Sequence, residues 1–325
     1  MRIGRFALAV SLFGSGFADW SPAAQAQGQY PVKPIRMIIP YTPGGSNDVI
    51  ARPIAAKLAE RLGQPVIVEN KPGAQARIGA EYVAKAAPDG YTLLVAPSGP
   101  LTINPAIYSR QEYAPLKDFA PISLMGEFPL VLAVNPKLGV DSVGGLVAYL
   151  KAEPKKANYG ASASPFQLAA ELFSQRSGVP LVHIPFKGSG DTVNAVVSGE
   201  VTMTLSDAGP VAGALEGGLI KALAVTSKGP HPAFPGVPTL IEAGYPDLEI
   251  TIFTGLVAPA GTPADIVKRL SDEVSAIAAL PEIRDRLAKV GIAATGATPE
   301  AFRARIERDI ARWTAVAKAA NITAD

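Results

Sequence analysis

The chain of 325 residues contains no cysteine and only two histidines, His183 and His231. Without cysteine, disulfides, lipid-modified cysteines and thiolate metal sites are excluded. His183 falls in a segment typical of a buried strand and His231 in a proline-rich loop, so neither is placed as a general base. Because a metal site would then need several spaced carboxylates, and the sequence offers no such cluster, we expect neither a metal nor a cofactor.

The serine- and glycine-rich segments also lack the patterns of catalytic loops. Ser162 and Ser164 lie in a Gly-Ala-Ser-Ala-Ser turn, which is not the Gly-x-Ser-x-Gly turn of hydrolases. Gly188-Ser189-Gly190 lacks the third glycine of a dinucleotide-binding loop and the Lys-Ser/Thr ending of a phosphate-binding loop. The sequence therefore predicts a protein that is not an enzyme.

Charge and long apolar runs are scarce as well. Charged residues make up 18% of the chain and the formal net charge is +2, with no concentrated Lys/Arg surface, so we expect no nucleic-acid partner. The apolar run 6–17 is too short to anchor a membrane protein. Arg2 and Arg5 precede this run and small residues follow at 24–26, so we expect residues 1–26 to be a signal peptide and the mature protein to be periplasmic.

Apolar segments with strand and helix periodicity alternate along the remaining chain. Strands are predicted at 35–39, 66–69, 92–96, 130–134, 157–159, 182–184, 201–205, 222–225 and 250–257. Helices are predicted at 49–62, 77–86, 143–151, 166–175, 192–198, 211–216, 264–279, 281–290 and 299–319. The alternation predicts an α/β protein with mainly parallel sheets flanked by helices.

The length of the chain favours two lobes over one, because roughly 300 residues exceed the usual size of a single core. Two segments, 122–130 and 248–257, stand between groups of βα units and lack the Gly/Ser composition of a flexible linker. We expect them to be hinge crossings between one lobe made of 27–125 and 253–325 and a second lobe made of 126–252. A ligand between such lobes can be enclosed by closure.

The most informative local pattern is the strand 35–39 followed by a glycine turn and a helix. Gly44 and Gly45 permit positive φ and a close approach to peptide N–H groups, and Ser46, Asn47 or Asp48 can cap the helix. Free N–H groups at a helix N-terminus, at the carboxyl end of a strand, are a common place for anions. This pattern by itself fits an anion site and an ordinary βα turn equally well.

Seven short motifs follow one another along the chain. They are Pro43-Gly44-Gly45 with Asp48, Gly63-Gln64-Pro65-Val66 with 68–74, Ala-Pro-Asp-Gly-Tyr-Thr-Leu-Leu at 87–94, Asn-Pro-Ala-Ile-Tyr at 104–108, Leu-Lys-Asp-Phe-Ala-Pro-Ile at 116–122, His-Ile-Pro-Phe-Lys-Gly at 183–188, and Ala-Pro-Ala-Gly-Thr-Pro at 258–263. Together they resemble the Bug (TctC-like) substrate-binding proteins of tripartite tricarboxylate transporters. The resemblance implies a two-lobed periplasmic-binding-protein fold of the Venus flytrap kind (type II).

The resemblance also implies a function and a set of site residues. A small organic carboxylate would bind between the lobes and be delivered by a monomeric receptor to the large and small membrane subunits of a permease. The residues that would bind it are Tyr41, Thr42, Pro43, Gly44, Gly45, Ser46, Asp48, Ser98, Gly99, Ser162, Ala163, Ser164, Phe186, Asp207 and Phe253. An alternative is a periplasmic sensor that signals to a membrane sensor kinase.

Departures from the usual family pattern concern the ligand more than the fold. The loop at Ser162 is shorter than is usual, and Gln167 stands where histidine is common. Arg77 replaces a usual asparagine and is either a cationic partner for a second carboxylate or a solvated helix start. Phe166, Phe186 and Phe253 favour an aromatic carboxylate over an aliphatic one.

Overall fold

The computed structural model describes residues 30–324, and the chain from Pro31 onward forms one compact unit. The predicted signal peptide, residues 1–26, lies outside the described residues. Within that described part, no helix has both the length and the apolar character that a membrane span requires.

The first sheet is built around three parallel strands, in the order β2 (Val66–Asn70), β1 (Ile35–Ile39) and β3 (Thr92–Pro97). β9 (Thr251–Pro259) pairs antiparallel with β3, and the first part of β4 (Phe119–Val134) pairs antiparallel with β9. The short β10 (Ala293–Ala294) adds an antiparallel pairing to β4. The apolar run predicted as a strand at 35–39 is β1, which is buried as expected of a strand with neighbours on both sides.

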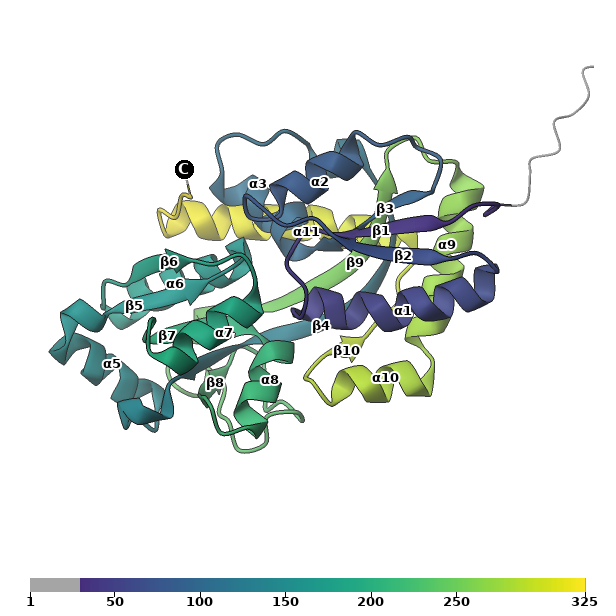
Figure 1. The fold of residues 1–325 in the computed structure, drawn as a ribbon. Coiled ribbons are helices and arrows are strands. Elements are labelled where there is room, and N and C mark those ends of the chain that lie inside the picture. The colour runs from purple at the N-terminus through teal and green to yellow at the C-terminus, as the bar shows by residue number, and fades with distance from the viewer. Residues whose placement is uncertain (1–29, 325) are drawn as a thin grey trace, which may run out of the picture. The chain divides into compact units, whose positions relative to one another are not determined.

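The second sheet has its own parallel part, in the order β7 (Met203–Asp207), β5 (Asn158–Ala161) and β6 (Val182–Pro185). The last residues of β4 pair antiparallel with β7 and with β8 (Lys221–Val225). β4 therefore belongs to both sheets, and Figure 1 shows it running from one to the other. Each sheet is mixed rather than purely parallel, because β4 and β9 run antiparallel to the strands beside them.

The helices flank these sheets close to the predicted residues (Figure 1). They are α1 (Ser46–Leu62), α2 (Arg77–Ala84), α3 (Asn104–Ile107), α4 (Pro115–Asp118), α5 (Val143–Ala152), α6 (Ser164–Ser177), α7 (Ser189–Ser198), α8 (Ala208–Glu216), α9 (Ala264–Ala278), α10 (Pro281–Ala288) and α11 (Pro299–Ala319), with shorter turns at Gly99–Ile103, Pro136–Leu138, Pro154–Lys156 and Pro246–Leu248. α6 and α7 begin before their predicted starts, because their N-cap residues are Ala163 and Gly188 rather than the polar residues that mark a start in sequence.

The two predicted crossings, 122–130 and 248–257, pair with each other. Phe119–Pro129 of β4 lies antiparallel to Thr251–Pro259, with register shifts between Pro121 and Ser123 and between Leu124 and Gly126. The sequence did not indicate one continuous 16-residue strand here, because Pro121, Gly126 and Pro129 read as interruptions. The strand accommodates Pro121 and Gly126 by shifting its register at these positions.

Phe253 of β9 links the core to the region between the sheets. Its ring meets Phe302 of α11 edge to face, with ring centroids 5.5 Å apart, and it is fully buried. A Cβ on Gly255 would stand 2.3 Å from Phe302, so this strand can pack under α11 only with glycine at that position. Arg305 of α11 donates to Glu127 of β4 and to Asp309, both at 2.6 Å, and so ties α11 to the crossing strand.

Candidate ligand-binding site

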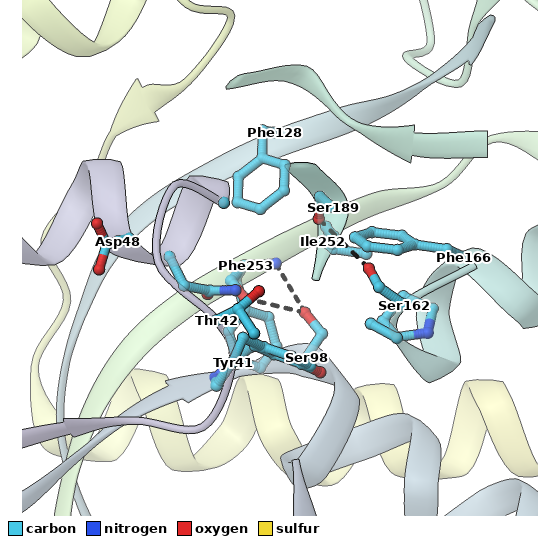
Figure 2. Close-up of a pocket in the computed structure, with 15 residues that line it drawn as sticks. Tyr41, Thr42, Asp48, Ser98, Phe128, Ser162, Phe166, Ser189, Ile252 and Phe253 are labelled. Carbon is cyan, nitrogen blue, oxygen red and sulfur yellow. Dashed lines mark hydrogen bonds between the residues drawn. The ribbon is translucent and has the colours of Figure 1, made fainter. Parts of the chain in front are cut away.

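A pocket lies between the two sheets, where several helices begin (Figure 2). The residues that line it are Tyr41, Thr42, Gly45, Asn47, Asp48, Pro97, Ser98, Phe128, Ser162, Ala163, Pro165, Phe166, Ser189, Ile252 and Phe253. Its cavity volume is about 20 Å³. That is close to the space one water needs, so a ligand of several carbon atoms requires the walls to separate.

The structure brings part of the predicted site together in this pocket. The predicted residues that line it are Tyr41, Thr42, Gly45, Asp48, Ser98, Ser162, Ala163 and Phe253. They come from the β1–α1 loop, the end of β3, the start of α6 and the middle of β9, which are far apart in sequence. Figure 2 shows Phe166 beside Ser162 and Ser189, with Ser98 hydrogen-bonded to Phe253.

The remaining predicted residues do not line the pocket. Pro43, Gly44, Ser46, Gly99 and Ser164 each adjoin a residue that does line it or lie within the same loop.

Phe186 and Arg77 lie elsewhere. Phe186 packs against Gly160, where an added Cβ would stand 3.1 Å from its ring. Arg77 stacks over the ring of Tyr108 at 4.3 Å and donates to the carbonyl oxygen of Ala74. The structure therefore gives Arg77 partners in its own loop and in the segment that follows α3.

Sequence reasoning missed the pocket residues Asn47, Pro97, Phe128, Pro165, Ser189 and Ile252. Three of these, Asn47, Pro97 and Pro165, are adjacent in sequence to predicted residues. A prediction that included the residues on either side would have found them. Ser189 lies three residues before the predicted helix start at 192, so the sequence did not indicate it. Phe128 and Ile252 lie on the paired crossing strands, and no local signal in the sequence distinguishes them from core residues.

Three helices that begin at the pocket have no side-chain cap of their own. Their N-cap residues are Gly45 for α1, Ala163 for α6 and Gly188 for α7. Side-chain caps occur at α5, from Ser142, and at α11, from Thr298, whereas α2, α9 and α10 also lack one. Helix N-termini carry unsatisfied N–H groups and partial positive charge, so this end of the molecule favours an anion.

Positive φ was predicted for Gly44 and Gly45 in the turn before α1, and the structure has it at Gly44 alone. Gly44 has φ +90°, a left-handed conformation that glycine adopts without strain. Gly45 has φ −77° and ψ 170°, which any residue can adopt, so positive φ is not the reason for glycine there. A Cβ on Gly45 would be 3.7 Å from Ser189 Oγ and 3.8 Å from Asp207 Oδ2, an ordinary contact distance.

Two buried hydroxyl groups lack a hydrogen-bond partner among the described residues: Tyr41 Oη, from a residue that lines the pocket, and Ser164 Oγ, from the residue next to Ala163. An added Cβ on Gly99 would lie 2.7 Å from the first and 3.2 Å from the second, so both converge over Gly99. Burial raises the pKa of the Tyr41 phenol, which keeps its proton available for donation. A buried hydroxyl without a hydrogen-bond partner lowers the stability of the protein. Two such donors beside the start of α6 can both donate to an acceptor oxygen of a ligand.

Asp48 is held by the protein. Arg52 donates to both of its oxygens at 2.8 Å, and Asn70 donates to Oδ1 at 3.2 Å. Burial alone would raise the pKa of the Asp48 carboxyl, but the hydrogen bonds from Arg52 and Asn70 outweigh it and lower that pKa. Asn70 also donates to the carbonyl oxygen of Tyr41 at 3.0 Å, so this cluster fixes the β1–α1 loop. Figure 2 shows Asp48 on α1, apart from Ser162 and Ser189.

The N-terminus of α1 has an acidic partner from the other sheet. The Ser46 N–H donates to Asp207 Oδ2 at 2.7 Å, and Ser46 Oγ accepts from the Gly209 N–H at 3.2 Å. Among residues 30–324, no group of three or more His, Asp or Glu side chains is arranged as metal ligands.

Comparison with known proteins decides the family. Residues 50–322 match the family model described as the tripartite tricarboxylate transporter family receptor (TctC). The chain is also 38% identical to BugT of Bordetella pertussis over 292 residues, which covers 89% of this chain and 90% of that protein. The chain belongs to the TctC family. The resemblance in the seven motifs is thereby confirmed.

Solved structures of similar proteins give the same fold. Rpa4515 of R. palustris, solved with adipate, is 35% identical with a TM-score of 0.88, covering 90% of this chain and 99% of that one. The periplasmic binding protein BugD is 30% identical with a TM-score of 0.87, covering 90% and 99%. MatC of Rhodopseudomonas palustris, solved with malate, is 31% identical with a TM-score of 0.85, covering 88% and 99%. The predicted α/β, two-lobed periplasmic-binding-protein fold of this TctC-family chain is confirmed.

Proposed function

We propose that this receptor binds a small organic carboxylate in the pocket between the two sheets and delivers it, in the periplasm, to the large and small membrane subunits of a tripartite tricarboxylate-type permease. The observation that supports the ligand class most directly is the pair of buried hydroxyls of Tyr41 and Ser164 beside the start of α6, which have no partner among residues 30–324. The similarity to proteins solved with adipate and malate, both carboxylates, points the same way.

The two sheets then belong to two lobes. Residues 27–125 and 253–325 form the first lobe, residues 126–252 form the second, and the paired strands near 122–130 and 248–257 act as the hinge. The narrow pocket supports a movement of this kind, because its walls must separate to admit a ligand. The ligand enters when the walls separate, and a ligand that then contacts both sides shifts the open–closed equilibrium by its difference in affinity for the two arrangements.

Each side of the pocket contributes a different part of the recognition. On the first side, Tyr41, Thr42, Gly45 and Ser98 present polar groups beside the N-terminus of α1. On the second side, Ser162 and Ser189 present hydroxyls beside α6 and α7, and the hydroxyl of Ser164 lies at the first residue of α6.

The carbon part of the ligand would contact Phe128, Phe166, Ile252 and Phe253. A charge-assisted hydrogen bond contributes roughly 1.5–3 kcal/mol and a helix N-terminus roughly 0.3–1 kcal/mol. Four or five such contacts can reach the roughly −8 kcal/mol of micromolar binding after the costs of association.

A thermal-shift screen tests the ligand class. The protein is unfolded, stripped of bound ligand and refolded, then heated with adipate, malate and benzoate, and with the matching uncharged amides. At a hundred times its dissociation constant, a cognate carboxylate should add roughly 2.7 kcal/mol of stability and raise the melting temperature by a few degrees. If the amides stabilised the protein as much as the carboxylates did, the anion site would be wrong.

A further inference from the structure

Asp207 makes an unusual contact for an acidic residue at the start of a helix. It is the N-cap of α8, the position from which an aspartate commonly accepts a hydrogen bond from its own helix. Its side chain makes no such cap in α8. Instead, it accepts from the Ser46 N–H of α1 at 2.7 Å, although 161 positions separate the two residues. The carboxylate thus occupies the N-terminus of a helix in the opposite lobe.

Asp207 is buried, so its stability as a carboxylate depends on the hydrogen bond from the Ser46 N–H. Asp207 is 1% exposed and Ser46 is fully buried. Among the residues that the structure describes, no Lys, Arg or His forms an ion pair with Asp207, and its other hydrogen bond is a 3.2 Å contact from Ser206. A buried carboxylate needs compensation, and the amide and dipole of α1 supply it.

Neighbouring contacts join the same two segments. Ser46 Oγ accepts from the Gly209 N–H at 3.2 Å, and a Cβ on Gly209 would stand 2.9 Å from that oxygen. At the β6–α7 loop, a Cβ on Gly188 would stand only 1.7 Å from Thr42 Oγ1. The β1–α1 loop therefore packs directly on the β7–α8 and β6–α7 loops.

We infer that Asp207 is a positioning residue for ligand capture: its carboxylate binds the N-terminus of α1 in place of a ligand carboxylate and favours the closed arrangement of the lobes. It acts through closure and not by touching the ligand, because it does not line the pocket. The inference rests on the proposed function in one respect, namely that closure serves binding. The contact at the start of α1 is then made by the protein, and the start of α6 is left for the ligand.

The experiment measures the distance between the lobes without any ligand. Because the chain has no cysteine, Glu112→Cys and Glu200→Cys place one spin label on each lobe, both at exposed positions, for pulsed electron–electron distance measurement on the stripped, refolded mature chain. Asp207→Asn is compared with the wild type. Asp118→Asn is the matched control, because Asp118 also accepts a backbone N–H at 2.7 Å, from Ala114, but within the single turn of α4.

A second pair of variants tests the donor while leaving Asp207 intact. Ser46 is the first residue of α1, where proline is tolerated, so Ser46→Pro removes the N–H, while Ser46→Ala keeps it. Both Asp207→Asn and Ser46→Pro should lower the ratio of closed to open molecules about tenfold, the effect of losing a hydrogen bond to a charged group. Ser46→Ala should have a smaller effect, and Asp118→Asn should match the wild type.

Three results would overturn the inference. The first is a wild-type protein that is already mostly open. The second is that Asp207→Asn and Ser46→Pro give the same distance distributions as the wild type. The third is that the distances in Asp118→Asn lengthen as much as those in Asp207→Asn. Since no ligand is added, failure of every carboxylate to bind would count against the proposed function and leave this result as it stands.

Discussion

The N-termini of α1 and α6 face the same pocket, yet their polar groups are satisfied in different ways. At α1, the Ser46 N–H already holds a carboxylate, that of Asp207, at 2.7 Å. At α6, the Ser164 hydroxyl is fully buried and has no partner among the described residues, and the Tyr41 hydroxyl beside it has none either. The difference suggests a division of roles, in which α1 helps to close the lobes and α6 receives the ligand.

The largest effect is expected from a change that keeps the lobes apart. In Gly188→Ala the new Cβ would lie 1.7 Å from Thr42 Oγ1, although the extended backbone of Gly188 suits any residue. Overpacking of this kind costs about 1–3 kcal/mol, so affinity for a cognate carboxylate should fall roughly 10- to 100-fold in titration calorimetry.

Gly190→Ala is the control for Gly188→Ala. Gly190 lies two residues further on, in α7, and a Cβ there meets nothing within 4 Å. We expect unchanged affinity and equal or greater stability, because alanine suits a helix better than glycine. Equal losses of affinity in the two variants would mean that the contact between Thr42 and Gly188 does not govern closure.

The next prediction compares a buried hydroxyl without a partner with one that has a partner. Tyr41→Phe removes a hydroxyl that is unpaired in the described structure, so the ligand-free protein should be as stable as the wild type or more stable, by up to about 1–3 kcal/mol. The same variant should bind the carboxylate about tenfold more weakly. Chemical denaturation and calorimetry give the two numbers.

Tyr113→Phe is the matched comparison. Tyr113 is equally buried, but its hydroxyl donates to the carbonyl oxygen of Pro100 at 2.9 Å. This variant should therefore lose about 1 kcal/mol of stability without a comparable loss of affinity. If Tyr41→Phe were the less stable of the two, the Tyr41 hydroxyl would have a partner within the protein.

The smallest effect concerns the cluster that fixes the β1–α1 loop. The pKa of the Asp48 carboxyl is below its ordinary value, so its contribution to stability is present above the unfolded pKa and is lost as the pH falls through the folded pKa. Asp48→Asn should cost about 1 kcal/mol at neutral pH. The gap between variant and wild type should close as the pH falls below about 4.

Denaturant unfolding of both proteins between pH 7 and pH 3 checks this. A gap that stayed constant over the whole range would show that the Asp48 charge does not contribute and that only the shape of the side chain matters.

The sequence predicted the elements of this fold better than their pairing. The apolar run at 35–39 marks a buried strand, and Gly63, which follows the last residue of α1 in a left-handed conformation, marks a helix end, because these signals are local. The pairing of β4 with β9 could not be predicted, since the two strands are brought together by the whole of the second lobe.

The same distinction applies to the site. The serines at 162–164 and the turn at Gly44 were recognisable from their own neighbours. The partner of the Ser46 N–H was not, because Asp207 reaches it from a strand 161 positions away. A carboxylate at the end of a strand looks the same in sequence whether it contacts a ligand or a helix of the opposite lobe.

The most direct test of the account is a titration of one cognate carboxylate against the wild type, Ser164→Ala and Ser142→Ala. Both variants remove a serine hydroxyl at the start of a helix, but Ser142 caps α5 away from the pocket. The account predicts a roughly 10- to 100-fold loss of affinity in Ser164→Ala alone, with Ser142→Ala binding as the wild type does. Equal affinity in Ser164→Ala and the wild type would contradict the claim that the ligand carboxylate binds at the start of α6.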